Sequence, residues 1–466
     1  MKRLGMVVVA VAVMGSPVMA QDATSKLMAL AAERSVSLMQ ISYEYTQDAS
    51  VPVPPQKYTA QAICLTKEGL FMTYGIVAGM RAQDISDLTL TPPGDIGPSV
   101  KAEFLWTDRE TNISFLRATE KKGDFVPVEF NTRAELKIGA KVATVGMFED
   151  DPAHTPYVNV GYISSVLRLP GPIVLVAGGS TTNDGSPVLN EAGEFIGVTM
   201  SQFLRYQTRT PQGVQEVQLD PKALGHFFRP ASEFAHVLDY ARKNPTKPRV
   251  LSWIGVLDFR ALDENSIFKS DVPAVVVGKV ADGGPAASAG LREHDIIVAV
   301  DGKGLEKFSS PMLVRTAFVL RLIRLAPGQT ATFTVRRDDK QTDVKVTAAA
   351  QPQDDTQVAR YVVRQLGFLV RERAEIDKYI LPAEMADTAG LLVLQVQQNS
   401  PGDRAGLRPG DLVVSVNNEP VSKMAAFKSM MSTALGKMPP AAVSISVRRG
   451  GDTIPLVLQP PTPGGQ

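Results

Sequence analysis

The feature that most constrains the fold of this chain is an internal repeat in its second half. The run Pro285 to Val300 matches the run Pro401 to Val416 without a gap, and both carry Ala-Gly-Leu-Arg, then Asp and an apolar stretch. Each copy is typical of a short helical turn that stops at Gly, a polar turn that ends at Asp, and a β-branched strand. The duplication therefore predicts two small domains of one fold.

A short apolar segment with a central glycine lies upstream of each copy. Trp253-Ile254-Gly255-Val256 precedes the first, and Leu366-Gly367-Phe368-Leu369 precedes the second. Together with the downstream repeat, these segments resemble PDZ domains, in the form that follows the protease domain of HtrA-type proteins. The resemblance implies two peptide-binding loops, formed by Ile254, Gly255, Val256, Leu366, Gly367 and Phe368.

In such a loop, successive backbone N–H groups bind a chain-terminal carboxylate, and an extended peptide adds as a strand. Glycine lets the main chain approach closely. The groove helices are expected near Pro311 to Leu325 and Lys423 to Leu435. The same motif is also needed simply to fold the domain, so it leaves open whether either groove is free or is filled by the chain itself or by a neighbouring subunit.

One position separates the two copies. His294 stands in the first copy where Gly410 stands in the second. If this turn requires a positive φ, histidine is tolerated less well than glycine. The first groove is then expected to be the less typical one.

Length and linker composition indicate several domains. A chain of 466 residues exceeds what one hydrophobic core usually supports. The basic, proline-containing segment Ala241 to Pro248 is typical of an interdomain linker. We predict a signal peptide at 1–20, a first folded domain at 21–245, PDZ-like domains at 250–350 and 360–460, and a disordered tail at 461–466.

The first 20 residues have the pattern of a secretory signal. Lys2 and Arg3 form a positive end, an apolar segment follows, and Val18-Met19-Ala20 is a small-residue cleavage site. This predicts a periplasmic or secreted protein, with an uncleaved anchor as the alternative. The single cysteine, Cys64, cannot form an intramolecular disulfide, and its apolar neighbours predict a buried structural thiol.

Charge excludes one class of partner. The formal net charge is +1 and no long run of Lys or Arg occurs. The positive field that attracts nucleic acid is therefore missing, and we expect no nucleic-acid binding.

The region between the signal and the linker predicts a mainly β fold. Short β-rich runs separated by Gly, Pro and Asp turns include Tyr58 to Thr73, Lys141 to Phe148 and Tyr157 to Val166. This pattern is consistent with a double β-barrel. Ser25 to Gln40 is the exception, because its apolar residues have helical spacing.

The stretch Thr181 to Asn190 resembles the nucleophile loop of HtrA/Deg-type, trypsin-like serine proteases. Asp184 stands where that family carries its serine. By the same resemblance Asn112 stands at the aspartate, and Ile76 (or Gly75, in the other alignment) stands at the histidine. Serine-protease chemistry needs a hydroxyl, an imidazole and a carboxylate, so the resemblance implies a degenerate member without catalytic residues.

Other groups could in principle rebuild the chemistry. Ser180 and Ser186 are candidate hydroxyls, and the four histidines are His154, His226, His236 and His294. None of these histidines lies in the block that would aim it at the loop. Asp184 and Asn112 offer two oxygen ligands, fewer than the roughly six to eight that calcium takes, so we expect no metal and no cofactor.

These observations favour an exported, catalytically inactive HtrA-like protein that binds C-termini or extended segments of other proteins through its PDZ grooves. It would act as a scaffold, as a regulator of an active protease relative, or as a holder of unfolded chains. The alternative is an active envelope serine endopeptidase with a rearranged catalytic site. A structural role with vestigial grooves is also open, and the resemblance permits a homotrimer.

Overall fold

The structure is a computed structural model, and it describes residues 16–45, 56–74, 85–95, 97–120, 124–148, 151–179, 183–200, 204–210, 213–219, 225–262, 270–338, 340–355, 357–437 and 440–461. Only the backbone is described for 16–22, 204–210 and 213–219. The chain divides into two compact units, Met1–Arg249 and Val250–Gln466. Residues 1–15 of the predicted signal peptide, and 462–466 of the tail predicted at 461–466, lie outside the described residues.

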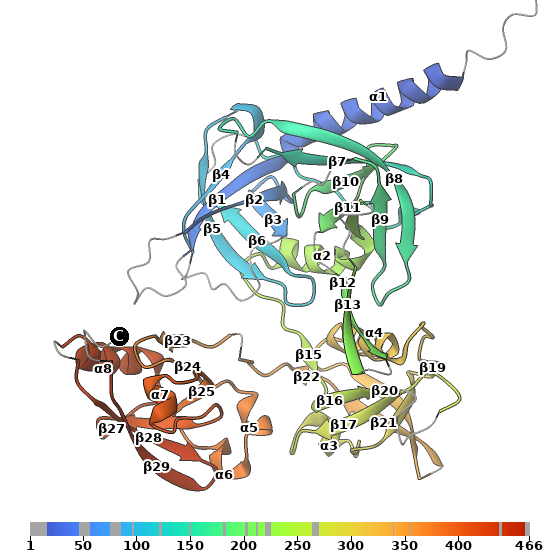
Figure 1. The fold of residues 1–466 in the computed structure, drawn as a ribbon. Helices are drawn as coiled ribbons and strands as arrows, with labels where there is room; N and C mark the ends of the chain where they lie inside the picture. The colour runs from blue at the N-terminus through green and yellow to red at the C-terminus, as the bar shows by residue number, and fades with distance from the viewer. Residues whose placement is uncertain are drawn as a thin grey trace, which may run out of the picture. The chain divides into compact units, whose positions relative to one another are not determined.

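The first unit is built from two closed, six-stranded antiparallel barrels (Figure 1). The strand order is β1-β2-β3-β6-β5-β4 in the first barrel and β10-β11-β14-β9-β8-β7 in the second. The prediction of a mainly β, double-barrel fold is confirmed. The first barrel consists of β1 (Leu38–Tyr45), β2 (Gln56–Cys64), β3 (Leu70–Tyr74), β4 (Ile85–Thr91), β5 (Val100–Thr107) and β6 (Ile113–Ala118). The second consists of β7 (Lys141–Met147), β8 (Pro156–Leu167), β9 (Ile173–Ala177), β10 (Pro187–Asn190), β11 (Phe195–Met200) and β14 (His226–Pro230), and a separate hairpin is formed by β12 (Leu204–Thr210) and β13 (Gly213–Leu219).

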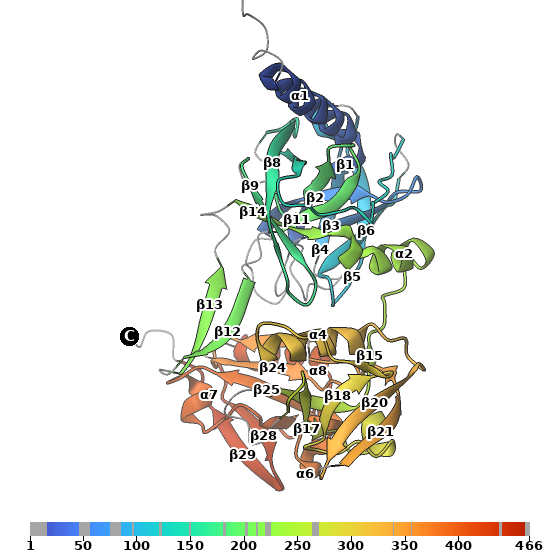
Figure 2. The same ribbon diagram turned by 90° about the vertical axis from the view of Figure 1, so that its right-hand side faces the viewer.

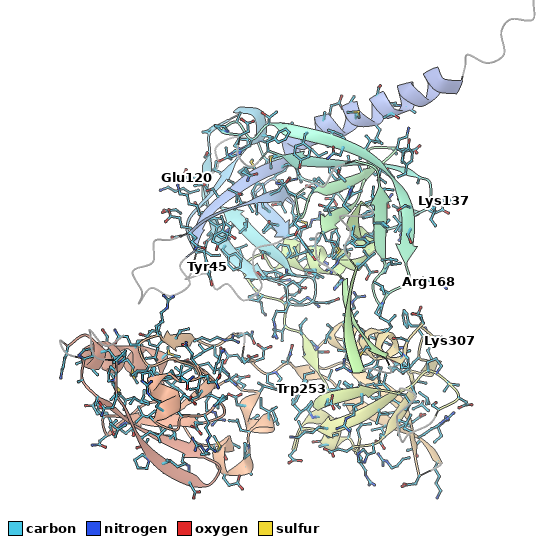
Figure 3. All side chains as sticks on the ribbon, viewed as in Figure 1. Tyr45, Glu120, Lys137, Arg168, Trp253 and Lys307 are labelled. Atoms are coloured by element: carbon cyan, nitrogen blue, oxygen red, sulfur yellow. The ribbon has the colours of Figure 1, made fainter. Side chains whose placement is uncertain are left out.

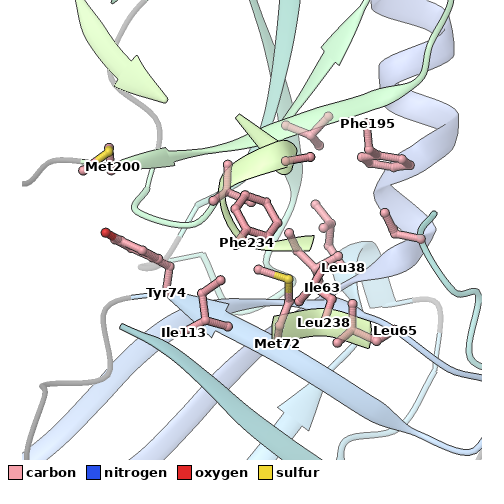
Figure 4. Close-up of a cluster of buried hydrophobic side chains, with 14 of the residues drawn as sticks. Leu38, Ile63, Leu65, Met72, Tyr74, Ile113, Phe195, Met200, Phe234 and Leu238 are labelled. Carbon is pink, nitrogen blue, oxygen red and sulfur yellow. The ribbon is translucent and has the colours of Figure 1, made fainter. Parts of the chain in front are cut away.

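One hydrophobic cluster joins the two barrels to the helix α2 (Ala235–Lys243), as Figure 4 shows. Met72 and Tyr74 come from β3, Met200 ends β11, and Leu238 lies on α2. Figure 2 shows α2 beside the barrels. β3 is buried along its whole length, so it forms part of the core of this unit.

The helix α1 (Ser16–Arg34) precedes the first barrel. Its residues Leu27 and Ala31 are buried. The helical pattern predicted to run to Gln40 was wrong at its end, because Ser35–Ser37 form a 3-10 turn and Leu38 begins β1, which pairs with β2. No helix in the described part of the chain has the length and apolar character needed to cross a bilayer.

The second unit contains two sheets of similar order, each with one long helix. The first sheet runs β16-β17-β18-β20-β21, with β19 on β18, and the second runs β23-β24-β25-β26-β28-β29, with β27 on β26. The long helices, α4 (Pro311–Ile323) and α8 (Met424–Leu435), confirm the two groove helices expected from the sequence. The first domain contains β15 (Ser252–Trp253), β16 (Val256–Ala261), β17 (Val275–Val280), α3 (Pro285–Ser288), β18 (Ile296–Val300), β19 (Lys303–Gly304), β20 (Thr330–Arg337), β21 (Lys340–Thr347) and β22 (Ala349–Ala350). The second contains β23 (Arg360–Val363), β24 (Phe368–Glu372), α5 (Asp377–Ile380), α6 (Ala383–Ala386), β25 (Leu391–Val396), α7 (Pro401–Arg404), β26 (Leu412–Val416), β27 (Glu419–Pro420), β28 (Val443–Arg449) and β29 (Asp452–Leu458).

The aspartate shared by the two copies of the repeat is buried and paired with an arginine in each domain. The Asp295 carboxylate receives two 2.7 Å hydrogen bonds from Arg337, which also donates to the Gly290 carbonyl. In the second domain Arg449 makes the same bonds to Asp411. This bidentate pairing ties the turn to the strand that neighbours β18 in the first sheet (β20) and β26 in the second (β28).

The turn before each aspartate has a positive φ, as the comparison of the copies suggested. The angle is 71° at His294 and 91° at Gly410. Histidine therefore occupies a left-handed position that favours glycine.

Candidate functional site

The loop that resembles a nucleophile loop is held tightly against β11. Gly185 N–H donates to the Thr199 carbonyl at 2.9 Å, and Thr199 N–H donates to the Ser186 carbonyl at 2.8 Å. Ser186 N–H also donates to Thr199 Oγ1 at 2.9 Å, and this hydroxyl donates to the Asn183 carbonyl at 2.7 Å. Gly185 has a φ of 78°, and a Cβ there would lie 2.9 Å from Tyr74 Cβ. Only glycine fits this turn against β3.

Asp184, which the sequence resemblance assigned to the position of a serine nucleophile, is half-buried beside Tyr74. Burial raises the pKa of the Tyr74 hydroxyl, the Arg229 guanidinium lowers it, and the Asp184 carboxylate raises it further. Arg229 lies 5.7 Å from the centre of the Tyr74 ring and donates to the Thr111 carbonyl at 2.9 Å. A carboxylate at this position provides no hydroxyl for attack on a carbonyl carbon.

The neighbouring serine is enclosed. Ser186 is fully buried, and its Oγ donates at 3.5 Å to the side-chain oxygen of Gln61 on β2. Gln61 Nε2 in turn donates to the Val145 carbonyl at 3.1 Å. The Ser186 hydroxyl thus faces an amide oxygen, which is far too weak a base to take its proton.

Asn112, which the sequence resemblance assigned to the position of a catalytic aspartate, lies in a turn organised by Asp108. Asp108 Oδ1 accepts hydrogen bonds from Glu110 N–H, Thr111 N–H and Thr111 Oγ1 at 3.2, 2.9 and 2.8 Å. Asn112 has a φ of 59°, and its buried Oδ1 has no hydrogen-bond partner among the described residues. The turn that would present a catalytic carboxylate is intact, and it presents an amide.

The same turn is anchored by Arg249, which the sequence reasoning missed. Its Nε lies 2.7 Å from Asp108 Oδ2 and its Nη2 lies 2.6 Å from Glu110 Oε2, and both carboxylates are buried. Arg249 is separated from Asp108 by 141 positions. No local pattern could have revealed this pair.

The histidines of the first unit lie in three separate places. His154 is in a loop after Asp151 with a φ of 48°, and His236 Nε2 lies 3.1 Å from Glu110 Oε2. His226 starts β14, is buried, and has no hydrogen-bond partner on either ring nitrogen, and burial lowers its pKa below the ordinary value of 6.5. None of the three bonds to a serine hydroxyl in the part of the chain that the structure describes. His294 belongs to the second unit.

Three predicted site positions cannot be placed. Gly75, Ile76 and Ser180 lie outside the described residues. Within the described ranges, no group of three or more His, Cys, Asp or Glu side chains could hold a metal ion.

The first predicted peptide-binding loop lies at the start of β16, which is an edge strand in its sheet (Figure 1). Ile254 and Val256 are buried in the domain core. Gly255 has a φ of 84°, and a Cβ there would lie 2.8 Å from the Pro285 ring. Figure 3 labels Trp253, which precedes this loop. The backbone conformation therefore matches the glycine loop that the sequence predicted.

The edge of β16 faces α4, and one group from the helix reaches it. Arg315 Nε donates to the Phe259 carbonyl, and the Phe259 and Phe318 rings lie 5.1 Å apart. Arg315 is a groove residue that the sequence reasoning missed, because a lone arginine on a helix carries no local signal.

The second predicted loop is built in the same way. Leu366 and Phe368 are buried, and Gly367 has a φ of 71°, with Ser400 Cβ only 2.2 Å from where its Cβ would stand. Its strand β24 differs from β16, however, because it has a neighbour on each side, β23 and β25.

Three parts of the chain match known domain families. Residues 61–198 match the family described as "Trypsin-like peptidase domain". Residues 254–348 and 392–437 match two families described as "PDZ domain". These matches agree with the double barrel and with the two sheets that follow it.

Curated relatives share this organisation. The chain is 27% identical over 358 residues to "Probable periplasmic serine endoprotease DegP-like" of Brucella suis biovar 1 (strain 1330), an alignment that covers 73% of this chain and 63% of that protein. It is 26% identical over 417 residues to the protein of the same name from Hahella chejuensis (strain KCTC 2396), covering 84% and 78%. The chain thus spans 63% of the length of the Brucella relative.

Solved structures show the same fold. "HtrA-type protease AlgW with tripeptide" matches with a TM-score of 0.51 at 18% identity, covering 70% of this chain and 98% of that one. "HtrA-type protease AlgW with decapeptide" matches with a TM-score of 0.51 at 17% identity, covering 70% and 99%.

Proposed function

Given a chain with the HtrA/DegP-type arrangement of a trypsin-like domain followed by two PDZ domains, we propose that it is an exported, catalytically inactive member that binds polypeptides. It acts as a scaffold, as a regulator of an active protease relative, or as a holder of unfolded chains. The proposal keeps the domain limits 21–245, 250–350 and 360–460. The observation that carries it is the positive-φ loop at Gly255 beside the edge strand β16, in a chain whose nucleophile-like loop carries Asp184.

The geometry of the first unit supports the loss of hydrolysis. The only serine described in that loop, Ser186, is fully buried and bonded to an amide oxygen. His226, the deepest histidine of this unit, has no partner on either ring nitrogen. A hydrolytic serine needs a base within about 3 Å of its hydroxyl.

The groove of the first PDZ domain supports polypeptide binding. β16 has one side paired with β17, and its other side faces α4. An extended segment can pair with such an edge, while the loop at Gly255 offers backbone N–H groups to a terminal carboxylate. We therefore propose C-termini or extended segments as ligands. The relatives named as periplasmic support a periplasmic location, and a homotrimer remains part of the proposal.

The test of inactivity is a hydrolysis assay on the purified chain. An unfolded protein substrate and a fluorophosphonate probe are expected to give neither turnover nor labelling. The control variant is Ser186→Ala. Turnover or labelling in the parent would support the alternative, an active endopeptidase with a rearranged site, and its loss in Ser186→Ala would identify the nucleophile.

The test of binding is a screen of peptides with random C-terminal sequences. Peptides that bind the parent are expected to lose binding when their terminal carboxylate is amidated, because the loop then loses its anionic partner. Gly255→Val is expected to abolish binding at β16, since its Cβ would meet the Pro285 ring. Amidation changes only the peptide, so it decides the question even if Gly255→Val unfolds the domain. Binding that is indifferent to amidation would contradict carboxylate recognition.

A further inference from the structure

The segments that enter the two PDZ domains take different paths. In the first domain, β15 pairs with β22, at Ser252↔Ala350 and Trp253↔Ala349. In the second domain, the corresponding segment forms β23, which pairs antiparallel with β24 from Arg360↔Arg371 to Val363↔Phe368. The side of β16 that has no neighbouring strand is therefore covered on β24 by another strand of the chain itself.

β23 occupies the place where an added peptide strand would lie, because it packs against the groove helix α8 as well as against β24. The three elements are labelled together in the orange-to-red domain of Figure 1. The Tyr361 ring lies 6.2 Å from the Phe427 ring, and Lys428 Nζ lies 4.9 Å from the Tyr361 ring centre. Both partners belong to α8.

The side chains of β23 alternate as those of a bound peptide would. Val363 is 1% exposed and belongs to the core cluster that contains Leu366 and Phe368, whereas Val362 is 44% exposed. Tyr361 is half-buried against the helix. An antiparallel peptide in a PDZ groove likewise directs alternate side chains inward.

The end of β23 also fills the carboxylate-binding loop. The Val363 carbonyl accepts hydrogen bonds from Leu366 N–H at 3.1 Å and from Gly367 N–H at 2.8 Å. These are backbone donors of the loop that the sequence assigned to a peptide carboxylate. The Val363 carbonyl oxygen thus stands in for an oxygen of a terminal carboxylate.

We propose that β23 is a built-in ligand mimic that closes the second groove. The groove accepts a polypeptide C-terminus with valine at its end and an aromatic residue two positions before, and it does so only when β23 swings out. This proposal rests on the proposed peptide-binding function. It assigns peptide binding by the resting chain to the first groove, and it makes the second groove a conditional site.

The hairpin formed by β23 and β24 has few contacts that hold β23 in place. Its strand is four residues long, and its surface ion pair, Arg360 with Asp355 at 2.8 Å, is exposed and contributes little. The deep contacts are those of Tyr361 and Val363. A site that is available in only a fraction of molecules binds its ligand more weakly by that fraction, so weakening these two contacts raises the apparent affinity.

The probe is a fluorescent peptide ending in Arg-Tyr-Val-Val with a free carboxylate, and binding is measured on the full chain. Hydrogen exchange of 256–261 reports the first groove, and exchange of 368–372 reports the second. In Tyr361→Ala/Val363→Ala, the probe is expected to protect 368–372 and to bind there at least about tenfold more tightly than in the parent. The control is Val362→Ala, which removes an exposed side chain of the same strand and is expected to behave as the parent.

A reversible lock provides the second arm. Val362 and Leu369 face each other across the hairpin, and cysteines at directly opposed positions can form a disulfide. Oxidised Val362→Cys/Leu369→Cys is expected to give no protection of 368–372 at any probe concentration, and reduction is expected to restore the parent's behaviour. The lock decides the question even if the double alanine variant unfolds the domain.

Protection of 368–372 in the oxidised lock would overturn the proposal. So would a folded double alanine variant that binds the probe no better than the parent, or an equal gain in Val362→Ala. Hydrogen exchange of 256–261 distinguishes a failure of this proposal from a failure of the proposed peptide-binding function. If the first groove binds no peptide while the opened second groove does, the proposed function of the first domain fails and the ligand mimic stands.

Discussion

The turn at His294 and Gly410 offers a measurement in which each domain serves as the control for the other. Both residues adopt positive φ, at 71° and 91°. Their N–H groups make equivalent bonds, to the Val277 carbonyl at 2.8 Å and to the Val393 carbonyl at 2.9 Å. The two turns therefore share their backbone structure and differ in the presence of a side chain.

The expected magnitude follows from the backbone. An L-residue in the left-handed region costs about 1–2 kcal/mol, while glycine costs roughly 0.5–1 kcal/mol through its greater freedom in the unfolded chain. A Cβ at Gly410 would meet no atom within 4 Å, so packing adds nothing. We expect His294→Gly to stabilise the first domain by about 0.5–1 kcal/mol and Gly410→His to destabilise the second by a similar amount.

The assay is native-state hydrogen exchange in low urea, read separately from strands β17 and β18 and from strands β25 and β26. His294→Ala is the control, because it removes the imidazole and its contacts but keeps a Cβ at positive φ. It should not reproduce the gain. Faster exchange of the first domain in His294→Gly, or an unchanged second domain in Gly410→His, would refute the reasoning.

Three further predictions concern the first unit. Burial lowers the pKa of His226 below 6.5, so this histidine takes up a proton in the unfolded chain first as the pH falls. The free energy of unfolding should therefore decrease below pH 6.5 by up to about 1.4 kcal/mol per pH unit. Urea titrations of His226→Phe should lack this contribution. Arg249→Met leaves two buried carboxylates without their guanidinium, so the free energy of unfolding measured in urea should fall by about 3–5 kcal/mol. Arg249→Lys should recover part of this loss. Equal stability of the parent and Arg249→Met would contradict the anchoring role. Burial raises the pKa of the Cys64 thiol to about 12. Thiol reagents should therefore label the folded chain about a thousandfold or more slowly than the unfolded chain. Rapid labelling of the native protein would show that β2 is less protected than its burial indicates.

Much of the fold could be read from local pattern. The run Pro285 to Val300 and its copy predict a turn, an anchoring aspartate and a strand, and the structure shows Asp295 and Asp411 in the same pairing with arginine. The positive φ expected at His294 is present. The buried Cys64 was likewise predicted from its apolar neighbours. These features depend on residues close together in the chain, where periodicity and turn chemistry carry the information.

The candidate sites depend on pairings that no local pattern reveals. Ser186 meets Gln61 across 125 positions, and Arg249 meets Asp108 across 141. The sequence placed a glycine loop in each PDZ-like domain and expected the first groove to be the less typical one, because of His294. The structure instead leaves β16 as an edge strand and covers β24 with β23.

The sequence by itself determined the repeat, the double barrel and the residues at the protease-like positions, because backbone conformation and residue identity are local properties. Tertiary structure alone decided what each groove contains. Local pattern does not fix the partner of a four-residue strand such as Arg360–Val363. Its place on β24 depends on residues distant in the chain, because Tyr361 packs against Phe427 of α8 and Val363 joins the core of the second PDZ-like domain.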